Sequence, residues 1–194
     1  MSIRFRSTII TVIVAALCAT LLYYGIDYMK RRTTTHSDEA IATNIDQAIL
    51  NAPIVIMGIV TDGKGEPRNL RRDATDPTKE EARVVVPGTD YNVTVTQVLK
   101  GNLETGSQIK IAIGGGNYKS KKAPLRATVL AGEEYIFTIA PSSSGAQQYY
   151  GIIEPFIYQL KDNRVVAISN IEKYKAAFQE TEISEAEFWD KFKE

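Results

Sequence analysis

Cysteine and histidine are almost missing from this sequence of 194 residues. The single cysteine, Cys18, lies inside an apolar run, so the rest of the chain can form no disulfide and depends on packing for its stability. The single histidine, His36, follows that run. Metal sites built from His and Cys side chains, and nucleophile–histidine pairs, are therefore excluded by the residues available. We expect no metal, no cofactor and no catalytic residues.

Charge is missing from Ile9–Ile26, an apolar run whose polar residues are threonines. At 1.5 Å per residue, a helix over this run spans about 27 Å, close to the ~30 Å hydrocarbon core of a bilayer. Tyr23, Tyr24 and Tyr28 lie at its distal end, where aromatic rings favour the headgroup layer. We therefore predict an N-terminal transmembrane anchor with basic flanks over residues 1–32, which holds the chain in the membrane through residues 9–26.

A cleaved signal peptide is the alternative to an anchor. Its apolar region would be shorter and would end at a small-residue cleavage site, whereas Leu21–Ile26 continues past the one weak candidate, Ala16–Cys18. A lipoprotein signal at Cys18 would need a small preceding residue, and Leu17 is large. The basic residues on the two sides of the run nearly balance, so charge bias does not fix the orientation.

Excess positive charge is absent from the remaining chain. Residues 33–194 carry 18 basic and 22 acidic side chains. Nucleic-acid binding requires a basic face, so no nucleic-acid partner is predicted. The length left after the anchor suits one domain with a proper core, and we assign residues 33–194 to it.

The pattern of this domain is mainly β. A helix is predicted from a Ser37 cap to Pro53, with Ile41, Ile45 and Ile49 on one face. Strands are predicted where apolar or alternating residues recur, over 54–61, 91–99, 109–113, 135–139 and 149–153. A final hairpin is predicted over 156–160 and 165–168, around Asp162-Asn163. Five main strands favour a small barrel over about 53–168.

The barrel is flanked by loops and helices. Residues 62–83 and 114–126 are expected to form two long loops. Ser169 with Glu172, and Ser184 with Glu187, have capping-box spacing and predict two C-terminal helices over about 169–193. Trp189 and Phe192 give the last helix an apolar stripe that is expected to cover one end of the barrel. The fold class is therefore α+β, mainly β: a five-stranded OB-fold-like barrel with flanking helices, preceded by one transmembrane helix.

Three short motifs carry a family resemblance: Ala52–Val60, Val98–Gly101 and Leu130–Phe137. With them the chain resembles the netrin-like domain of tissue inhibitors of metalloproteinases and their cysteine-poor bacterial relatives. That resemblance implies an OB-fold that acts by binding, on the extracytoplasmic side of a bacterial membrane. Gly101 and Gly132 fit turns with positive φ in any such barrel. The N-terminal cysteine pair of the animal inhibitors is missing, so their mode of protease inhibition is not implied.

The strongest candidate site is the glycine-rich, basic segment 114–126. Backbone N–H groups of glycines and nearby cations can bind an anion, and the candidate residues are Gly115, Gly116, Lys119, Lys121, Lys122 and Arg126. A solvated loop between strands is the simpler interpretation, since the spacing of a phosphate loop is absent. The expected partners are an envelope protein or an anionic surface polymer. The alternative function is regulation or inhibition of an envelope enzyme.

Carboxylates offer weaker candidates. Asp73, Asp76, Glu80 and Glu81 lack the spacing of a calcium loop. Glu133 and Glu134 are adjacent, so in a strand they would point to opposite faces and could not converge on one bond. No enzyme is predicted.

Overall fold

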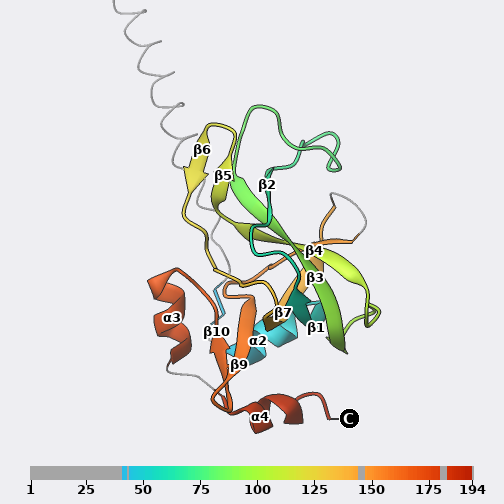
Figure 1. Cartoon of the computed structure of the whole chain (residues 1–194), viewed down its shortest axis with the longest axis vertical. Helices are drawn as coiled ribbons and strands as arrows, with labels where there is room; N and C mark the ends of the chain where they lie inside the picture. Colours follow the sequence, from blue (N-terminus) through green and yellow to red (C-terminus); the bar gives the residue numbers. More distant parts are fainter. Residues whose placement is uncertain (1–40, 43, 144–146, 180–182, 194) are drawn as a thin grey trace, which may run out of the picture. The chain divides into compact units, whose positions relative to one another are not determined.

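The computed structural model describes residues 41–42, 44–143, 147–179 and 183–193 (Figure 1). The chain divides into two compact units, Met1–Glu39 and Ala40–Glu194, and every described residue belongs to the second. The predicted anchor over residues 9–26, with the Ser37 cap, lies outside the described residues. Within the described ranges, no helix is both long enough and apolar enough to cross a bilayer.

Ten strands and three helices are described in Ala40–Glu194. The strands are β1 Ile54–Val60, β2 Glu66–Asn69, β3 Pro87–Lys100, β4 Gln108–Gly114, β5 Gly116–Tyr118, β6 Lys121–Ala123, β7 Glu134–Pro141, β8 Gln148–Tyr150, β9 Ile157–Lys161 and β10 Arg164–Ala167. The helices are α2 Ile45–Asn51, α3 Glu172–Gln179 and α4 Glu185–Asp190.

Five of the strands close into a barrel. The sheet runs in the order β1-β3-β4-β8-β7, and β7 pairs with β1 to complete the circle. All of these pairings are antiparallel except β4 with β8, which is parallel. The predicted mainly β fold with a five-stranded barrel is confirmed, and the barrel is compatible with an OB-fold-like domain. Strand β2 extends the sheet beside β3, and β9 and β10 extend it beside β7.

The continuous apolar run of β1 is explained by burial on both faces. Ile54 and Ile56 belong to a cluster inside the barrel, whereas Val55 and Met57 belong to a second cluster outside it. Successive side chains of a strand point to opposite faces, so a strand between two apolar layers needs apolar residues at both. The inner cluster also holds the predicted inward set of β3, namely Tyr91, Val93 and Val95.

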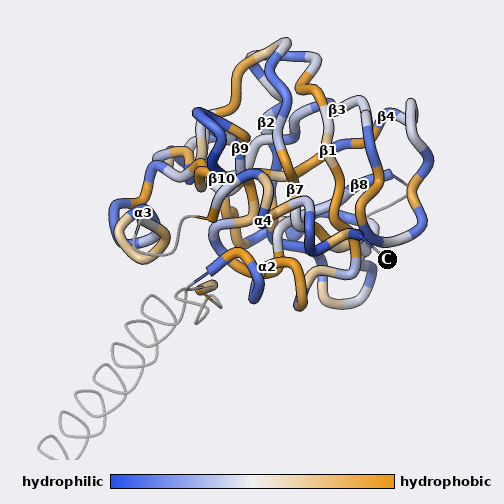
Figure 2. The backbone as a smooth tube through the Cα atoms, turned by 90° about the horizontal axis from the view of Figure 1, so that it is seen from below, coloured by the Kyte–Doolittle hydropathy of each residue, from blue (hydrophilic) through white to orange (hydrophobic). Residues whose placement is uncertain are grey.

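The second cluster lies between the barrel and the helices. It contains buried residues of α2, β1, β7, β9 and β10, together with Phe178 of α3 and Phe188 of α4. In the view from below, α2 and α4 lie against these strands (Figure 2). Both apolar clusters consist of residues from 42–192, so a fragment of residues 40–194 contains the whole described core.

The first helix is shorter than the sequence predicts. It begins at Ile45, where the Asn44 side chain accepts a hydrogen bond from the backbone N–H of Gln47. Ile41 is not on the predicted helical stripe: it forms a β-bridge with Glu154 and is 40% exposed. Periodicity placed Ile41 on the helix, but the Asn44 cap starts the helix one turn later.

The two predicted capping boxes have different outcomes. Ser184 and Glu187 form both reciprocal hydrogen bonds at the start of α4, which confirms the box. Ser169 does not cap α3, which begins at Glu172; its hydroxyl instead donates to the Arg126 carbonyl and accepts from the Ile171 N–H. The hydroxyl is used for the contact with Arg126 and for the turn before α3, so the predicted capping box does not form.

Turn predictions are confirmed where the signal is local. Asp162 and Asn163 have φ of 52° and 60° between β9 and β10, and Gly101 and Gly132 have φ of 96° and 82°. Both predicted long loops contain strands, so the loop assignment was wrong in part: β2 lies within residues 62–83, and β5 and β6 lie within residues 114–126.

Candidate binding surface at the basic end of the barrel

Two glycines turn the chain from β4 into β5. Gly115 and Gly116 have φ of 97° and 103°, and a Cβ on Gly115 would lie 2.0 Å from the carbonyl oxygen of Pro124. The Gly115 N–H donates to the Pro87 carbonyl at 2.9 Å. A positive φ and a close backbone approach both require glycine here. The Gly115 N–H is used inside the protein, so the first role of this glycine is to shape the turn.

The lysines of the candidate site lie on a hairpin. Strands β5 and β6 pair Tyr118 with Lys121 and Asn117 with Lys122, and Lys119 (φ 51°) with Ser120 makes the turn. Cross-strand partners share a face and neighbouring residues alternate, so Lys121 and Lys122 project to opposite faces. All three lysines are exposed. The structure thus brings them onto one hairpin without converging them on one point.

Arg126 is separated from these lysines. Its Nη1 lies 3.5 Å from Glu154 Oε1, and a Cβ on Gly114 would lie 2.7 Å from its Cδ. The side chain therefore lies against Gly114 and is paired with a carboxylate that is 13% exposed. Of the six predicted site residues, the glycines build the turn, the lysines occupy the hairpin and Arg126 contacts the neighbouring part of the barrel.

A buried asparagine organises the other long loop, residues 70–86. The Asn69 side-chain nitrogen donates to the carbonyls of Glu81 and Val84, and its oxygen accepts from the N–H groups of Arg71 and Val86. Asn69 is 1% exposed. A buried amide that satisfies four backbone groups fixes the loop that surrounds it. Sequence reasoning missed this residue, and no local pattern distinguishes it from other asparagines.

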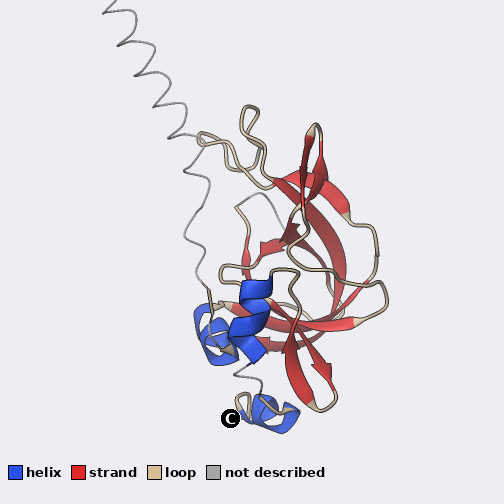
Figure 3. Ribbon diagram, turned by 90° about the vertical axis from the view of Figure 1, so that its left-hand side faces the viewer, coloured by secondary structure: helices blue, strands red, loops and turns tan. Residues whose placement is uncertain are grey.

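Glu80 joins this loop to the hairpin. One carboxylate oxygen accepts from the backbone N–H of Asn69 at 3.0 Å, and the other accepts a short hydrogen bond from the Tyr118 hydroxyl. This hydrogen bond raises the pKa of Tyr118 above its ordinary value, with smaller contributions from burial and from the charge of Glu80. The two segments therefore form one connected surface. In Figures 1 and 3 both lie at one end of the barrel, and the helices lie at the other.

The carboxylates of this surface accept hydrogen bonds from neighbouring residues of the same surface. Asp73 and Asp76 accept hydrogen bonds from the backbone N–H and hydroxyl of Thr75 and Thr78, respectively, and Asp76 also pairs with Lys79 at 2.8 Å. These hydrogen bonds lower the pKa of both carboxyl groups. Glu81 accepts from the backbone N–H of Arg83.

Most basic side chains of this surface have no such partner. Within the described part of the chain, no ion pair joins a carboxylate to Arg71, Arg72, Arg83, Lys119, Lys121 or Lys122. We call these six residues the basic end. Loop 70–86 and the hairpin carry seven basic against four acidic residues, whereas the rest of residues 33–194 carries 11 basic and 18 acidic ones.

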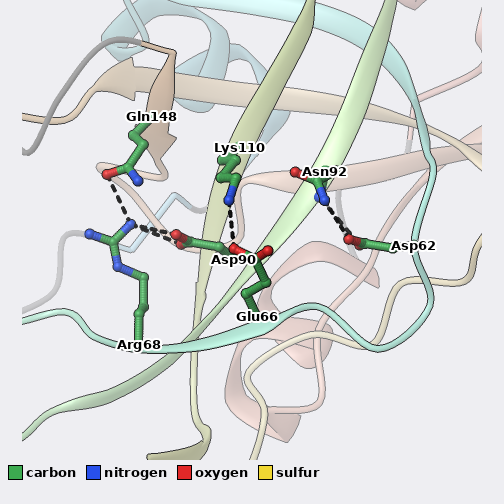
Figure 4. Close-up of polar contacts among 7 residues, drawn as sticks. All are labelled: Asp62, Glu66, Arg68, Asp90, Asn92, Lys110 and Gln148. Carbon is green, nitrogen blue, oxygen red and sulfur yellow. Dashed lines mark hydrogen bonds and ion pairs between the residues drawn. The ribbon is translucent and has the colours of Figure 1, made fainter.

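A polar network ties β2 to the barrel wall below this surface (Figure 4). Arg68 Nη1 donates to both carboxylate oxygens of Asp90, at 2.9 and 2.8 Å, and to Gln148 at 3.2 Å. Burial raises the pKa of Asp90 above its ordinary value, and the hydrogen bond and charge of Arg68 oppose that shift. Lys110 pairs with Glu66 at 2.5 Å. Since β2 leads into loop 70–86, this network sets the position of one half of the surface.

A second surface lies at the helical end. A groove of about 520 Å³ is lined by apolar residues of α2, of β3 and of the segment after α4, with lysines at its margin: Ile49, Leu50, Leu99, Phe192, Lys100, Lys191 and Lys193. Leu50 is 78% exposed. Two of these lysines pair with carboxylates, Lys191 with Asp46 and Lys193 with Asp190. Trp189 and Phe192 pack against the second apolar cluster, the one between the barrel and the helices, so their predicted packing role is confirmed.

The remaining sequence candidates take part in hydrogen bonds of the framework. Glu134 accepts from the Thr96 hydroxyl at 2.5 Å and Glu133 from the Gln159 amide at 3.1 Å, so each contacts a different strand. Among the residues with described positions, no group of three His, Cys, Asp or Glu side chains could hold a metal ion.

No protein-family model matches the chain, and no curated protein matches it.

Proposed function

We propose that the chain is a single-pass membrane protein whose domain is an extracytoplasmic binding module, with the basic end as its contact surface. The observation that carries this proposal is a set of six basic side chains for which the described residues provide no ion-pair partner. They lie on two segments that the hydrogen bond between Glu80 and Tyr118 joins. Exposed loops on a rigid β scaffold are a common place for binding. The resemblance to netrin-like domains supports binding over catalysis.

Two measurements test this function. Protease added to intact cells should remove the domain and leave the anchor, and protection of the domain would refute the extracytoplasmic placement. A photo-crosslinker at Ser120, in the hairpin turn, should form adducts in cells, whereas the same group at Asp162, in the exposed β9–β10 turn, should not. Equal adduct formation at both turns would refute the basic end as the contact surface.

Regulation of an envelope enzyme is the alternative, and the groove at the helical end favours it. An inhibitor or regulator is expected to present apolar surface to its target, and Leu50 at 78% exposure is such a residue. A crosslinker at Leu50 discriminates between the two functions: adducts there, and none at Ser120, would favour the regulator.

A further inference from the structure

We infer that the basic end docks on the phosphate groups of anionic phospholipids, in the membrane that holds the chain's own N-terminal segment. The inference rests on the proposed function, because it requires the apolar run Ile9–Ile26 to be an anchor. Three observations lead to it: the free positive charge of the basic end, the uneven charge of the domain, and the short connection between run and domain.

Basic side chains without ion pairs are concentrated at one end of the domain, because the nearby carboxylates accept hydrogen bonds from other groups. Asp73, Asp76 and Glu81 accept hydrogen bonds from their own loop, and Glu80 accepts from Asn69 and Tyr118. Their charges remain, but their oxygen atoms are directed to these donors. Lys79 pairs with Asp76, and Lys119 lies over the Tyr118 ring at 5.1 Å from its centroid. The six residues of the basic end form no ion pair among the described residues, so their charges can interact with anions outside the domain.

The charge is distributed so that an anionic surface would orient the domain. Loop 70–86 carries four basic and four acidic residues, and the hairpin adds three lysines, so the two segments together carry three positive charges in excess. The rest of residues 33–194 carries seven negative charges in excess. A negatively charged plane attracts the first and repels the second. Lysine side chains on opposite faces of a hairpin suit a diffuse layer of headgroups, whereas a single phosphate would need them to converge.

The length of the connecting segment makes such contact accessible. Residues 27–39 separate the apolar run from the compact unit. Thirteen extended residues reach up to about 45 Å, whereas a domain of this size has a radius of gyration of about 15 Å. A tether of this length holds the domain at an effective concentration in the millimolar range relative to the bilayer surface, so weak contacts are populated.

The experiment uses the full chain in lipid nanodiscs. Cys18 is changed to Ser and Ser120 to Cys, and an environment-sensitive fluorophore is attached at residue 120. Nanodiscs contain phosphatidylcholine alone, or equal parts of phosphatidylcholine and anionic phosphatidylglycerol. We expect a blue shift in the anionic discs only, and its loss when the Debye length falls from ~10 Å at 0.1 M salt to ~3 Å at 1 M.

Two variants with the same change of net charge distinguish docking through the basic end from a general effect of the domain's net charge. Changing Lys119, Lys121 and Lys122 to Glu should weaken docking by about 100-fold or more, because each basic residue near an anionic surface contributes about fivefold. Changing the exposed Lys64, Lys161 and Lys173 to Glu should leave the shift in place, since these residues lie outside the basic end.

The absence of a shift in the anionic discs, or its equal loss in both variants, would overturn the inference. A shift produced in phosphatidylcholine discs by soluble polyphosphate, and not by phosphatidylglycerol, would also overturn it and assign the basic end to a soluble polyanion. Failure of the proposed anchor is seen separately, as failure of the chain to remain with discs of phosphatidylcholine alone.

Discussion

The buried pair between Arg68 and Asp90 gives the sharpest test of how β2 is held. Their side chains are 9% and 7% exposed, and one guanidinium nitrogen contacts both carboxylate oxygens. We consider Arg68→Met, which keeps much of the apolar length of the side chain and removes its charge. The carboxylate of Asp90 then stays buried between β2 and β3 without the opposite charge.

Breaking a buried ion pair from one side costs about 3–5 kcal/mol, because the remaining charge is uncompensated. The double variant Arg68→Met with Asp90→Leu removes both charges, and replacing a buried pair by apolar residues is often neutral or stabilising by about 1–4 kcal/mol. We therefore expect the single variant of the 40–194 fragment to be much less stable than the double variant, although the double variant carries more substitutions.

The dependence on pH follows from the pKa of Asp90. Burial already raises this pKa, and loss of the arginine charge raises it further. A folded-state pKa above the unfolded value of about 3.9 means that the folded state binds more protons, so this contribution to stability falls as pH rises. The cost of Arg68→Met should be smaller at pH 5 than at pH 8.

Urea unfolding followed by Trp189 fluorescence measures these differences, with Lys64→Met as a control for loss of an exposed charge. A cost for Arg68→Met of less than about 1 kcal/mol, the size expected of a surface pair, would refute the role of the buried pair. So would a cost that is the same at both pH values.

Three further predictions concern the turn, the loop and the last helix. Gly115→Ala should destabilise the β5–β6 hairpin by about 2 kcal/mol or more, because a Cβ would meet the Pro124 carbonyl. Hydrogen exchange of the hairpin amides measures this loss. In the control Gly106→Ala, whose Cβ meets nothing within 4 Å, exchange of the neighbouring amides should change much less. Asn69→Ala removes four hydrogen bonds, each worth about 1 kcal/mol, so trypsin should cleave loop 70–86 in the variant before the rest of the fragment, and unchanged resistance would contradict this. Ser184→Ala should cost about 1 kcal/mol. Hydrogen bonds from Ser184 lower the pKa of Glu187, so the stability that this carboxylate adds should be present above its unfolded pKa and vanish as pH falls through the lower folded value. By urea unfolding, Glu187→Gln should therefore be less stable than the parent at neutral pH, and this difference should disappear in acid.

Local sequence signals were enough for several elements. The apolar run of β1, the alternation of Tyr91, Val93 and Val95, the Asp162-Asn163 turn and the Ser184 capping box all depend on residues within a few positions of one another. Burial on one face and the conformational preference of a turn or cap act over that same range. The five-stranded barrel followed from the number and spacing of such strands.

The candidate site was predicted only in part. The sequence indicated Lys119, Lys121 and Lys122 by their proximity along the chain, and the hairpin confirms that they lie together. It did not indicate Arg71, Arg72 and Arg83, which come from another segment. Nor did it show that Arg126 pairs with Glu154, since that contact joins residues 28 positions apart.

By itself, the sequence determined that this chain has a mainly β domain, an uncharged apolar run near its N-terminus and an inventory poor in His and Cys. Only the tertiary structure decided that β4 pairs in parallel with β8, that Asn69 organises loop 70–86, and that Glu80 joins this loop to the hairpin. The physical reason is that most of these contacts join groups that are 12 to 38 positions apart along the chain. Each is selected by closure of the barrel and by the need of buried polar groups for partners, and neither condition leaves a local pattern.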